Sequence, residues 1–172
     1  MSEQVTIRKF TVADIKNKVK WVNDPLNNKY LHYTLPLEYE KTMRWFESVK
    51  DDKTRYDCVI EYGGVSVGLI GLLNIDEQNK KAEVYVVLGE HDYKGKGVAN
   101  RAGIKLLDHA FAVLGLEKIC SYMEVDNVAS QKCWKRMGFV QEGLLRSDII
   151  YNGKKVDRYA YACFKEHHQD RK

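Results

Sequence analysis

The sequence predicts an α+β fold with a mostly antiparallel sheet. Two residue pairs, Gly63-Gly64 and Asn152-Gly153, each lie between two apolar, strand-like runs, which is typical of tight β-hairpin turns. Segments with apolar residues at helical spacing lie before and between these runs. The 172 residues contain no repeat, low-complexity segment or linker, which indicates a single domain, 1–172, with a frayed polar tail from about residue 166 that includes His167-His168.

The expected elements follow from local signals along the chain. An alternating run predicts the first strand, and Thr11 is expected to cap the first helix, which Asn23-Asp24-Pro25 ends. The expected helices are Val12–Val22, Glu38–Lys50, Val98–Leu114 and Val128–Met137. The expected strands are Val5–Phe10, Tyr56–Tyr62, Val65–Ile75, Ala82–Leu88, Lys118–Val125, Leu144–Tyr151 and Lys155–Phe164. In the third helix, His109 is expected on the polar side, and the apolar face is expected to carry Ile104, Leu107, Phe111 and Leu114.

The composition is that of an ordinary soluble protein. Hydrophobic residues make up 44% and charged residues 30%, and a net charge of only +4 does not suggest nucleic acid as a partner. No apolar run reaches membrane-spanning length, so we expect no membrane partner and a cytoplasmic location. No histidine pair has the spacing of a zinc site, and no metal is expected. Four widely spaced cysteines are expected to be reduced core residues: Cys58, Cys120, Cys133 and Cys163.

A glycine loop between an expected strand and an expected helix indicates a phosphate-binding site. In Lys94-Gly95-Lys96-Gly97-Val98-Ala99, two glycines let the backbone approach a ligand closely, and the helix that begins here directs its unpaired N–H groups outward. The loop lacks the Gly-Lys-Ser/Thr ending of a nucleotide P-loop and the third glycine of a Rossmann fingerprint. It therefore predicts another kind of phosphate site.

The loop resembles the pyrophosphate loop of the GNAT N-acetyltransferases, and a second motif adds to the resemblance. The segment Asn127 to Phe139 is similar to the family signature N-x-x-[AS]-x-x-x-[YW]-x-x-x-G-F, and the residues after it resemble the RimJ/RimL-like branch. The resemblance covers Val5 to Phe164. It implies a mixed, mostly antiparallel sheet of about six or seven strands flanked by about four helices. It also implies a V-shaped splay between the two central parallel strands, Ala82–Leu88 and Lys118–Val125.

The resemblance implies acetyl-CoA as the cosubstrate. The backbone of Val87 and Leu88 would bond the pantetheine arm, and Asn127 would reach it from the other wall of the splay. The backbone N–H groups of the loop would hold the pyrophosphate, with charge added by Lys94 and Lys96. Lys132 and Lys135 would either meet the adenosine phosphates or lie on a solvated helix face. The loop residues concerned are Lys94, Gly95, Lys96, Gly97, Val98 and Ala99.

The implied reaction is direct attack of an amine on the thioester. A lysine-like amine has a pKa of about 10.4, so a base that removes its proton helps. In the family a Glu at the position of Glu83 often serves as base or water positioner, and the alternative here is a structural salt bridge; His32 is a second candidate base. Trp134 stands where many relatives have the tyrosine that protonates the thiolate, and an indole is no useful acid. Either the thiolate leaves unassisted, or Ser130, Tyr122 or Tyr85 assists.

The acceptor amine is the most open part of the prediction. The entry Trp21-Val22-Asn23-Asp24-Pro25 resembles amino-sugar N-acetyltransferases of the PseH type, so a nucleotide-linked amino sugar or a similar small molecule is the main expectation. Residues outside any regular pattern, Tyr30, His32 and Tyr33, are the pocket candidates. The candidates for binding a diphosphate are Arg44, Arg146 and Arg158. The larger apolar residues nearby, Trp21, Trp45 and Phe46, are expected in the core.

Three other functions stay open. One is acetylation of protein N-termini, including ribosomal proteins, which needs an open groove. Another is acetylation of polyamines, which needs an acidic pocket, whereas the acidic residues are not clustered in the sequence. The third is a non-catalytic CoA-binding module, for which Trp134 is the one supporting feature. The late hairpin is a plausible homodimer edge.

Overall fold

The computed structural model describes residues 4–170, and its seven strands form one sheet. The two ends of the expected domain, residues 1–3 and 171–172, lie outside this range. The strand order is β1-β2-β3-β4-β5-β7-β6, and every neighbouring pair is antiparallel except β4 and β5. The strands are β1 (Val5–Lys9), β2 (Tyr56–Tyr62), β3 (Val65–Asp76), β4 (Lys81–Leu88), β5 (Lys118–Glu124), β6 (Val140–Tyr151) and β7 (Lys154–Phe164).

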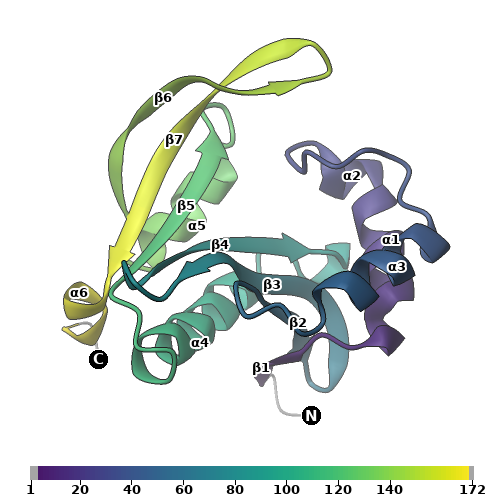
Figure 1. Ribbon diagram of the computed structural model, residues 1–172, viewed down its shortest axis with the longest axis horizontal. Coiled ribbons are helices and arrows are strands. Elements are labelled where there is room, and N and C mark those ends of the chain that lie inside the picture. The colour runs from purple at the N-terminus through teal and green to yellow at the C-terminus, as the bar shows by residue number, and fades with distance from the viewer. Residues whose placement is uncertain (1–3, 171–172) are drawn as a thin grey trace.

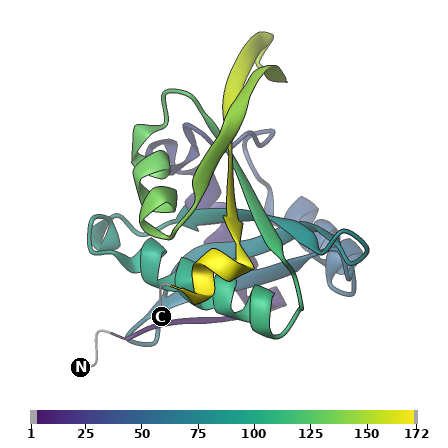
Figure 2. The same ribbon diagram turned by 90° about the vertical axis from the view of Figure 1, so that its left-hand side faces the viewer.

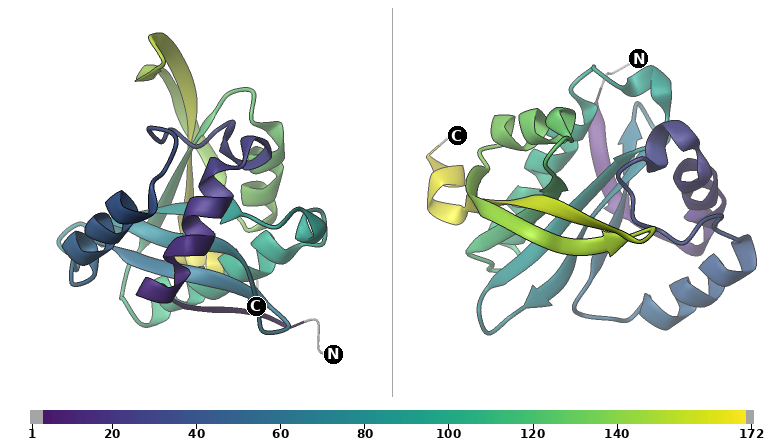
Figure 3. Two further views of the ribbon diagram at one scale, coloured as in Figure 1. Left: turned by 90° about the vertical axis from the view of Figure 1, so that its right-hand side faces the viewer. Right: turned by 90° about the horizontal axis from the view of Figure 1, so that it is seen from above.

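The helices cover both faces of the sheet (Figure 3). They are η1 (Val12–Asp14), α1 (Ile15–Asn23), α2 (Pro25–Asn28), α3 (Tyr39–Val49), η2 (His91–Tyr93), α4 (Val98–Ala112), α5 (Val128–Arg136) and α6 (Lys165–Gln169). The helices α1 and α3 lie on one face, and α4 and α5 lie on the other (Figures 1 and 3). No helix in the described part of the chain is long and apolar enough to cross a membrane.

Each face of the sheet has its own hydrophobic core. The larger core packs α4 and α5 against the sheet and includes Leu106, Ile70 and Trp134. The smaller core packs α1 and α3 against the other face, around the fully buried Ile15 and Trp21. Trp21 is buried in this core as expected, whereas Trp45 and Phe46, also expected in the core, are only partly buried and pack against it. The four cysteines are free, and three of them are buried, as predicted.

The tight turns predicted from glycine pairs are present. Gly63 and Gly64 have φ angles of 57° and 84°, and Asn152 and Gly153 have φ angles of 50° and 74°. Two successive residues in the left-handed region form the turn whose twist matches that of the flanking strands. These residues therefore fix the register of β2 against β3 and of β6 against β7.

The sheet opens between its two parallel strands. β4 and β5 pair at Lys81, Ala82 and Glu83 only, and β5 then leaves β4 at an angle (Figure 1). Beyond this point β5 continues to pair with β7, and the β6–β7 hairpin rises away from the rest of the sheet (Figures 1 and 2). The predicted V-shaped splay is confirmed.

Several element predictions need correction. β6 begins at Val140 instead of Leu144, because a register shift between Gln141 and Gly143 lets the strand continue through residues that look like a turn. A short helix, α2, follows the first long one, with Pro25 at its first position and the Asp24 carboxylate accepting a hydrogen bond from the N–H of Leu26 at 2.9 Å.

Two histidines that were expected in polar surroundings are partly or fully covered. His109 stacks on the Tyr56 ring with centroids 4.5 Å apart, and burial lowers the pKa of His109. His168 was expected in a frayed tail. It belongs to α6, which lies beside α4 (Figure 2). His168 is 5% exposed, and its Nε2 lies 2.7 Å from an Asp108 carboxylate oxygen of α4. The C-terminal segment through residue 169 is thus docked on the main body.

Candidate active site

The splay between β4 and β5 holds a cleft of about 160 Å³. Its walls come from the two strands, from α5 and from the segment after α2. The lining residues are Tyr30, Leu31, His32, Val84, Tyr85, Val86, Ser121, Tyr122, Met123, Glu124, Asn127, Ser130, Trp134 and Arg158. Within residues 4–170, β4 runs from Val84 to Leu88 without a partner on the β5 side, while β3 pairs with its other edge. The free edge can accept an extended ligand as an added strand.

The glycine loop and the start of α4 form a second hollow, of about 310 Å³, next to the cleft. Gly95 and Gly97 have φ angles of 76° and 72°, and a Cβ added to either glycine would have no atom within 4 Å. The backbone therefore leaves open space in front of the N-terminus of the 15-residue helix α4, where a phosphate is favourably bound. The loop thus leaves room for the predicted pyrophosphate.

The charged residues around this hollow differ from the prediction. Lys132 lines it, together with Arg136. Lys135 was also expected there but points elsewhere, because its ammonium lies over the Tyr161 ring at 5.9 Å from the centroid. The two loop lysines have partners as well: the Lys94 ammonium donates to Asn27 Oδ1 at 2.7 Å, and the Lys96 ammonium lies 5.5 Å from the centroid of the Tyr93 ring.

The sequence reasoning missed Asn100, which also lines the loop hollow. Its Nδ2 is buried and has no hydrogen-bond partner among the described residues. An unpaired buried donor is costly, so its position in the hollow fits a ligand oxygen. Asn100 could have been predicted from its place in the first turn of the helix that follows the glycine loop.

The far wall of the cleft is one face of α5. Asn127, Ser130 and Trp134 lie three and four residues apart, so they share this face. Asn127 Oδ1 caps the helix by accepting from the N–H of Ser130 at 3.2 Å, which leaves the amide NH₂ of the side chain as a donor. Trp134 is 3% exposed and packs on Phe139, so its ring closes the wall without supplying an acid.

The acceptor side of the cleft contains a pair that the sequence did not predict. His32 Nε2 lies 2.5 Å from Glu124 Oε1, and both side chains line the cleft. Glu124 lies on the same face of β5 as Tyr122, because side chains alternate between the two faces of a strand. This alternation is the sequence feature from which Glu124 could have been predicted. Tyr30 lines the cleft too, and its hydroxyl lies 3.4 Å from the carbonyl oxygen of Asp126.

Three other acceptor-side candidates lie away from the cleft lining: Tyr33, Arg44 and Arg146. Tyr33 is next to Lys18, whose ammonium is 5.6 Å from the centroid of the Tyr33 ring, and burial raises the pKa of Tyr33. Arg44 is exposed on α3, and Arg146 is exposed on β6. Of the three arginines considered for a diphosphate, Arg158 alone lines the cleft, and it pairs with Asp148 at 2.5 Å.

Tyr85 is unsuited to the proton-donor role considered for it. Its hydroxyl donates to Asp57 Oδ1 at 2.6 Å on the face of β4 that meets α1 and α3. Burial, followed by the nearby Asp57 charge, raises the pKa of Tyr85 well above 10. A phenol that is harder to deprotonate and already bonded to a carboxylate cannot readily give its proton to a thiolate.

Glu83 lies at the closed end of the splay and not in the cleft itself. It lines an adjoining hollow of about 300 Å³ with Asn74, Asp76 and Lys81, and Tyr122 lines both spaces. Within the described residues the Glu83 carboxylate makes no hydrogen bond or ion pair, so the salt bridge considered for it is not formed. The cleft and this hollow adjoin at Tyr122, and we call the two together the acceptor groove.

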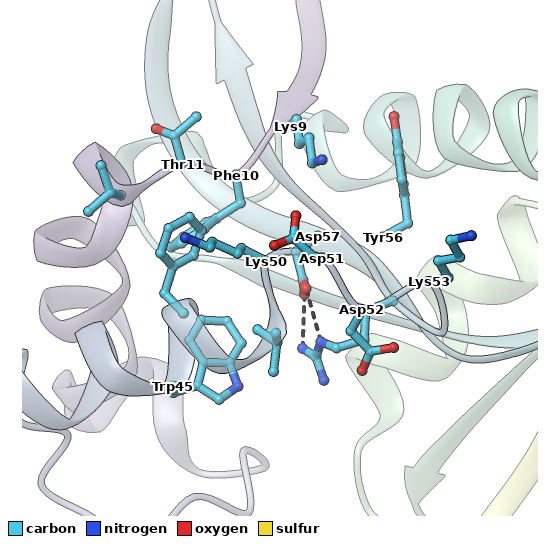
Figure 4. A pocket seen from close by; sticks show the side chains of 14 residues that line it. Lys9, Phe10, Thr11, Trp45, Lys50, Asp51, Asp52, Lys53, Tyr56 and Asp57 are labelled. Atoms are coloured by element: carbon cyan, nitrogen blue, oxygen red, sulfur yellow. Dashed lines mark hydrogen bonds and ion pairs between the residues drawn. The ribbon is translucent and has the colours of Figure 1, made fainter.

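A further hollow, of about 670 Å³, lies between α3 and the start of β2 (Figure 4). Phe10, Trp45 and Phe46 give it an apolar wall, and an ion pair of Arg55 with Asp57 at 3.0 Å lies inside it. This hollow is larger than the cleft but shares no lining residue with it, and it contains neither the strand splay nor the glycine loop. The smaller cleft is therefore the candidate active site.

Comparison with known proteins gives the same assignment. Residues 4–140 match the family described as the acetyltransferase (GNAT) domain. The chain is a GNAT N-acetyltransferase. As a GNAT enzyme it uses acetyl-CoA, and the free edge of β4 and the open loop at Gly95 and Gly97 fit the pantetheine arm and the pyrophosphate of this cosubstrate.

This GNAT enzyme is similar to several named acetyltransferases. It is 28% identical over 169 residues to N-acetyltransferase p20 of Bacillus licheniformis, with 95% of this chain and 94% of that protein covered. It is 27% identical over 146 residues to spermidine N(1)-acetyltransferase of Escherichia coli K12, with 76% and 78% covered. The fold matches the structure of spermidine N-acetyltransferase from Vibrio cholerae in complex with CoA and spermine, at a TM-score of 0.89, 23% identity and coverage of 98% and 99%.

Proposed function

We propose that this enzyme acetylates a primary amine of a small aliphatic polyamine. The observation that carries the proposal is the acceptor groove, which has a carboxylate at each of two separate points. Glu124 lies in the open cleft, and Glu83 lies in the adjoining hollow beyond Tyr122. A linear molecule with amines at both ends matches this arrangement, because one amine can react while a distal ammonium lies near Glu83.

The charges of the groove favour a polyamine over a nucleotide-linked amino sugar. A diphosphate needs cations that are free to bind it, whereas Arg158 is paired with Asp148, and Arg44 and Arg146 are exposed outside the cleft lining. The similarity to spermidine acetyltransferases supports the same choice. We therefore prefer the polyamine, which the sequence left as an alternative, to the amino sugar.

Each wall of the cleft has its own part in the proposed reaction. The free edge of β4 at Val87 and Leu88 binds the pantetheine arm, and the N–H groups at the start of α4 bind the pyrophosphate. The amine enters from the acceptor groove and attacks the thioester carbon, so that a C–N bond forms and the C–S bond breaks. Ser130, on the α5 wall, is the hydroxyl we propose to protonate the thiolate.

Measurement of thiol release from acetyl-CoA with a panel of acceptors tests the proposal. The panel contains spermidine, butylamine as a matched monoamine, a UDP-linked amino sugar and a peptide with a free N-terminus. We expect the highest kcat/KM with spermidine. Turnover only with the peptide or the sugar would contradict the polyamine proposal, and CoA binding without any turnover would indicate a binding module.

The variant Glu83→Gln sharpens the same test. It removes the charge at the distal end of the groove, so we expect the KM for spermidine to rise about tenfold, since a hydrogen bond to a charged group contributes about 1.5–3 kcal/mol. Butylamine has no distal ammonium, so its KM should stay nearly unchanged. If kcat falls for both amines at constant KM, Glu83 takes part in proton transfer instead of recognition.

A further inference from the structure

The short contact between His32 and Glu124 joins two segments that are far apart in the sequence. The two side chains are 24% and 18% exposed, and Nε2 of the imidazole lies 2.5 Å from Oε1 of the carboxylate. The His32 ring also packs edge-on against Tyr151 of the β6–β7 hairpin, with centroids 4.9 Å apart. The imidazole is thus held in one orientation at the mouth of the acceptor groove.

The contact determines which nitrogen of the ring can act as a base. An ionised carboxylate only accepts hydrogen bonds, so Nε2 must carry the proton that Glu124 receives. In a neutral ring the lone pair is then on Nδ1, for which the described residues provide no hydrogen-bond partner. This is the arrangement in which a carboxylate fixes the tautomer and the orientation of a histidine.

The surroundings of the pair contain charges of both signs. Arg158 is the register partner of Glu124 across β5 and β7, and it is paired with Asp148. A hydrogen bond with Tyr30 raises the pKa of Lys29, and the charges of Asp126 and Glu124 add to this effect. The hydroxyls near the pair belong to Tyr30, Tyr122 and Tyr151, and the Tyr151 hydroxyl lies 3.4 Å from the carbonyl oxygen of Tyr33.

From this geometry we infer that His32 is the general base of the reaction and that Glu124 is its positioning residue. The inference rests on the proposed function. The acceptor arrives as an ammonium, and His32 Nδ1 takes one proton from it to give the neutral amine. The amine attacks the thioester carbon, and the C–S bond breaks. The second N–H proton goes to the departing thiolate through the Ser130 hydroxyl, and His32 returns its proton to solvent, so the products are the amide, the thiol and one released proton.

Acceptors of matched size and different basicity test this inference. The amines are ethylamine, which is protonated at neutral pH, and a fluorinated ethylamine whose conjugate acid has a pKa below the assay pH. We expect His32→Gln to lower kcat/KM for ethylamine about 100-fold, the lower end of the range for general-base catalysis. The fluorinated amine is already neutral and needs no base, so its kcat/KM should change less than about threefold. Glu124→Gln should give the same pattern with a smaller loss.

A control variant separates proton transfer from loop positioning. Tyr151→Phe removes the hydroxyl contact to Tyr33 and loosens the same segment without removing a base, so it should lower kcat/KM for both amines by the same factor. Equal losses for both amines in His32→Gln would overturn the inference. Addition of imidazole to His32→Gly should restore part of the ethylamine rate, and absence of any restoration together with equal losses would leave His32 a purely structural role. If wild type acetylates neither amine nor any polyamine, the proposed function fails instead.

Discussion

At the scale of single residues, Lys18 is the least expected feature of the protein. It is 5% exposed in the core between α1 and α3, and its ammonium lies 3.9 Å from the centroid of the Trp45 ring. Burial lowers the pKa of Lys18 to about 8, against opposing attraction by Asp57. The folded chain binds a proton at this lysine less readily than the unfolded chain does. The buried charge therefore lowers the free energy of unfolding at every pH at which both states are protonated.

The sign of this effect gives a pH-dependent prediction. Below pH 8 the cost is complete, and it disappears as pH rises from about 8 to the unfolded value of 10.5, because the folded state then binds fewer protons. Removal of the buried charge should raise the free energy of unfolding at pH 7 by about 3 kcal/mol, and loss of the cation–π contact should offset part of this gain. We therefore expect Lys18→Met to raise the free energy of unfolding by about 2 kcal/mol at this pH.

Urea denaturation at pH 7 and at pH 10 measures this gain. The gain should be clearly smaller at pH 10 than at pH 7. Lys16→Met is the matched control, because Lys16 is exposed on the same helix and should change stability little at either pH. An equal gain at both pH values would show that packing, and not the buried charge, is the cause.

The residues of the site differ in how far the sequence could predict them. Asn127 and Ser130 belong to a motif with fixed spacing on one helix, so their shared face followed from the sequence. Lys135 lies on the same helix, but it is five residues after Ser130 and so turned from it by about 140°, which takes its side chain to Tyr161. Glu124 carries no local signal of function, since only the approach of His32 makes it part of a site.

At the scale of elements, α4 connects the loop to the core and offers a matched pair of glycines. Gly97 begins the helix and Gly115 follows its end, with φ angles of 72° and 67°, and an added Cβ meets no atom within 4 Å at either place. Alanine should therefore cause similar backbone strain at both positions, about 1–2 kcal/mol. Gly97 faces the loop hollow, whereas Gly115 does not line it.

We expect Gly97→Ala to weaken CoA binding at least tenfold, because its methyl group takes the space in front of the helix N-terminus and the strain disfavours the loop conformation. Gly115→Ala should lower Tm by a similar amount and leave the Kd for CoA unchanged. Isothermal titration calorimetry with CoA and thermal denaturation measure the two effects. Equal CoA affinity of the two variants would place the pyrophosphate elsewhere.

The buried face of α4 shows where periodicity misleads. Ile104 and Leu114 were expected to be buried, and each is 37% exposed. Leu107 and Phe111 are buried as expected, but the small residues Ala102, Gly103 and Ala110 share the buried face with them. Gly103 approaches Met137 so closely that a Cβ would lie 2.1 Å from its sulfur. A pattern based on large apolar side chains gives little weight to alanine and glycine, although close packing between helices depends on them.

At the scale of the whole molecule, the splay makes a prediction about ligand-induced protection. Pantetheine bound along β4 and pyrophosphate bound at the loop should slow hydrogen–deuterium exchange in residues 84–88 and 95–99. The hairpin turn at residues 151–154 is distant from both segments along the sheet order and serves as the internal control. Mass spectrometry with and without CoA measures the effect. Protection confined to the hollow beside α3 would contradict the assigned site.

The sequence by itself determined the elements, the two hairpin turns and the family. These depend on local chemistry: glycine and asparagine in the left-handed region, a helix that begins directly after a glycine loop, and a motif with fixed spacing on one helix. The acceptor groove was decided by the tertiary structure. Two of its carboxylates, Glu83 and Glu124, are far apart in the chain and line adjoining parts of the groove only because β4 and β5 lie side by side and then diverge. Their chemistry depends on distances in space, which spacing along a strand does not specify.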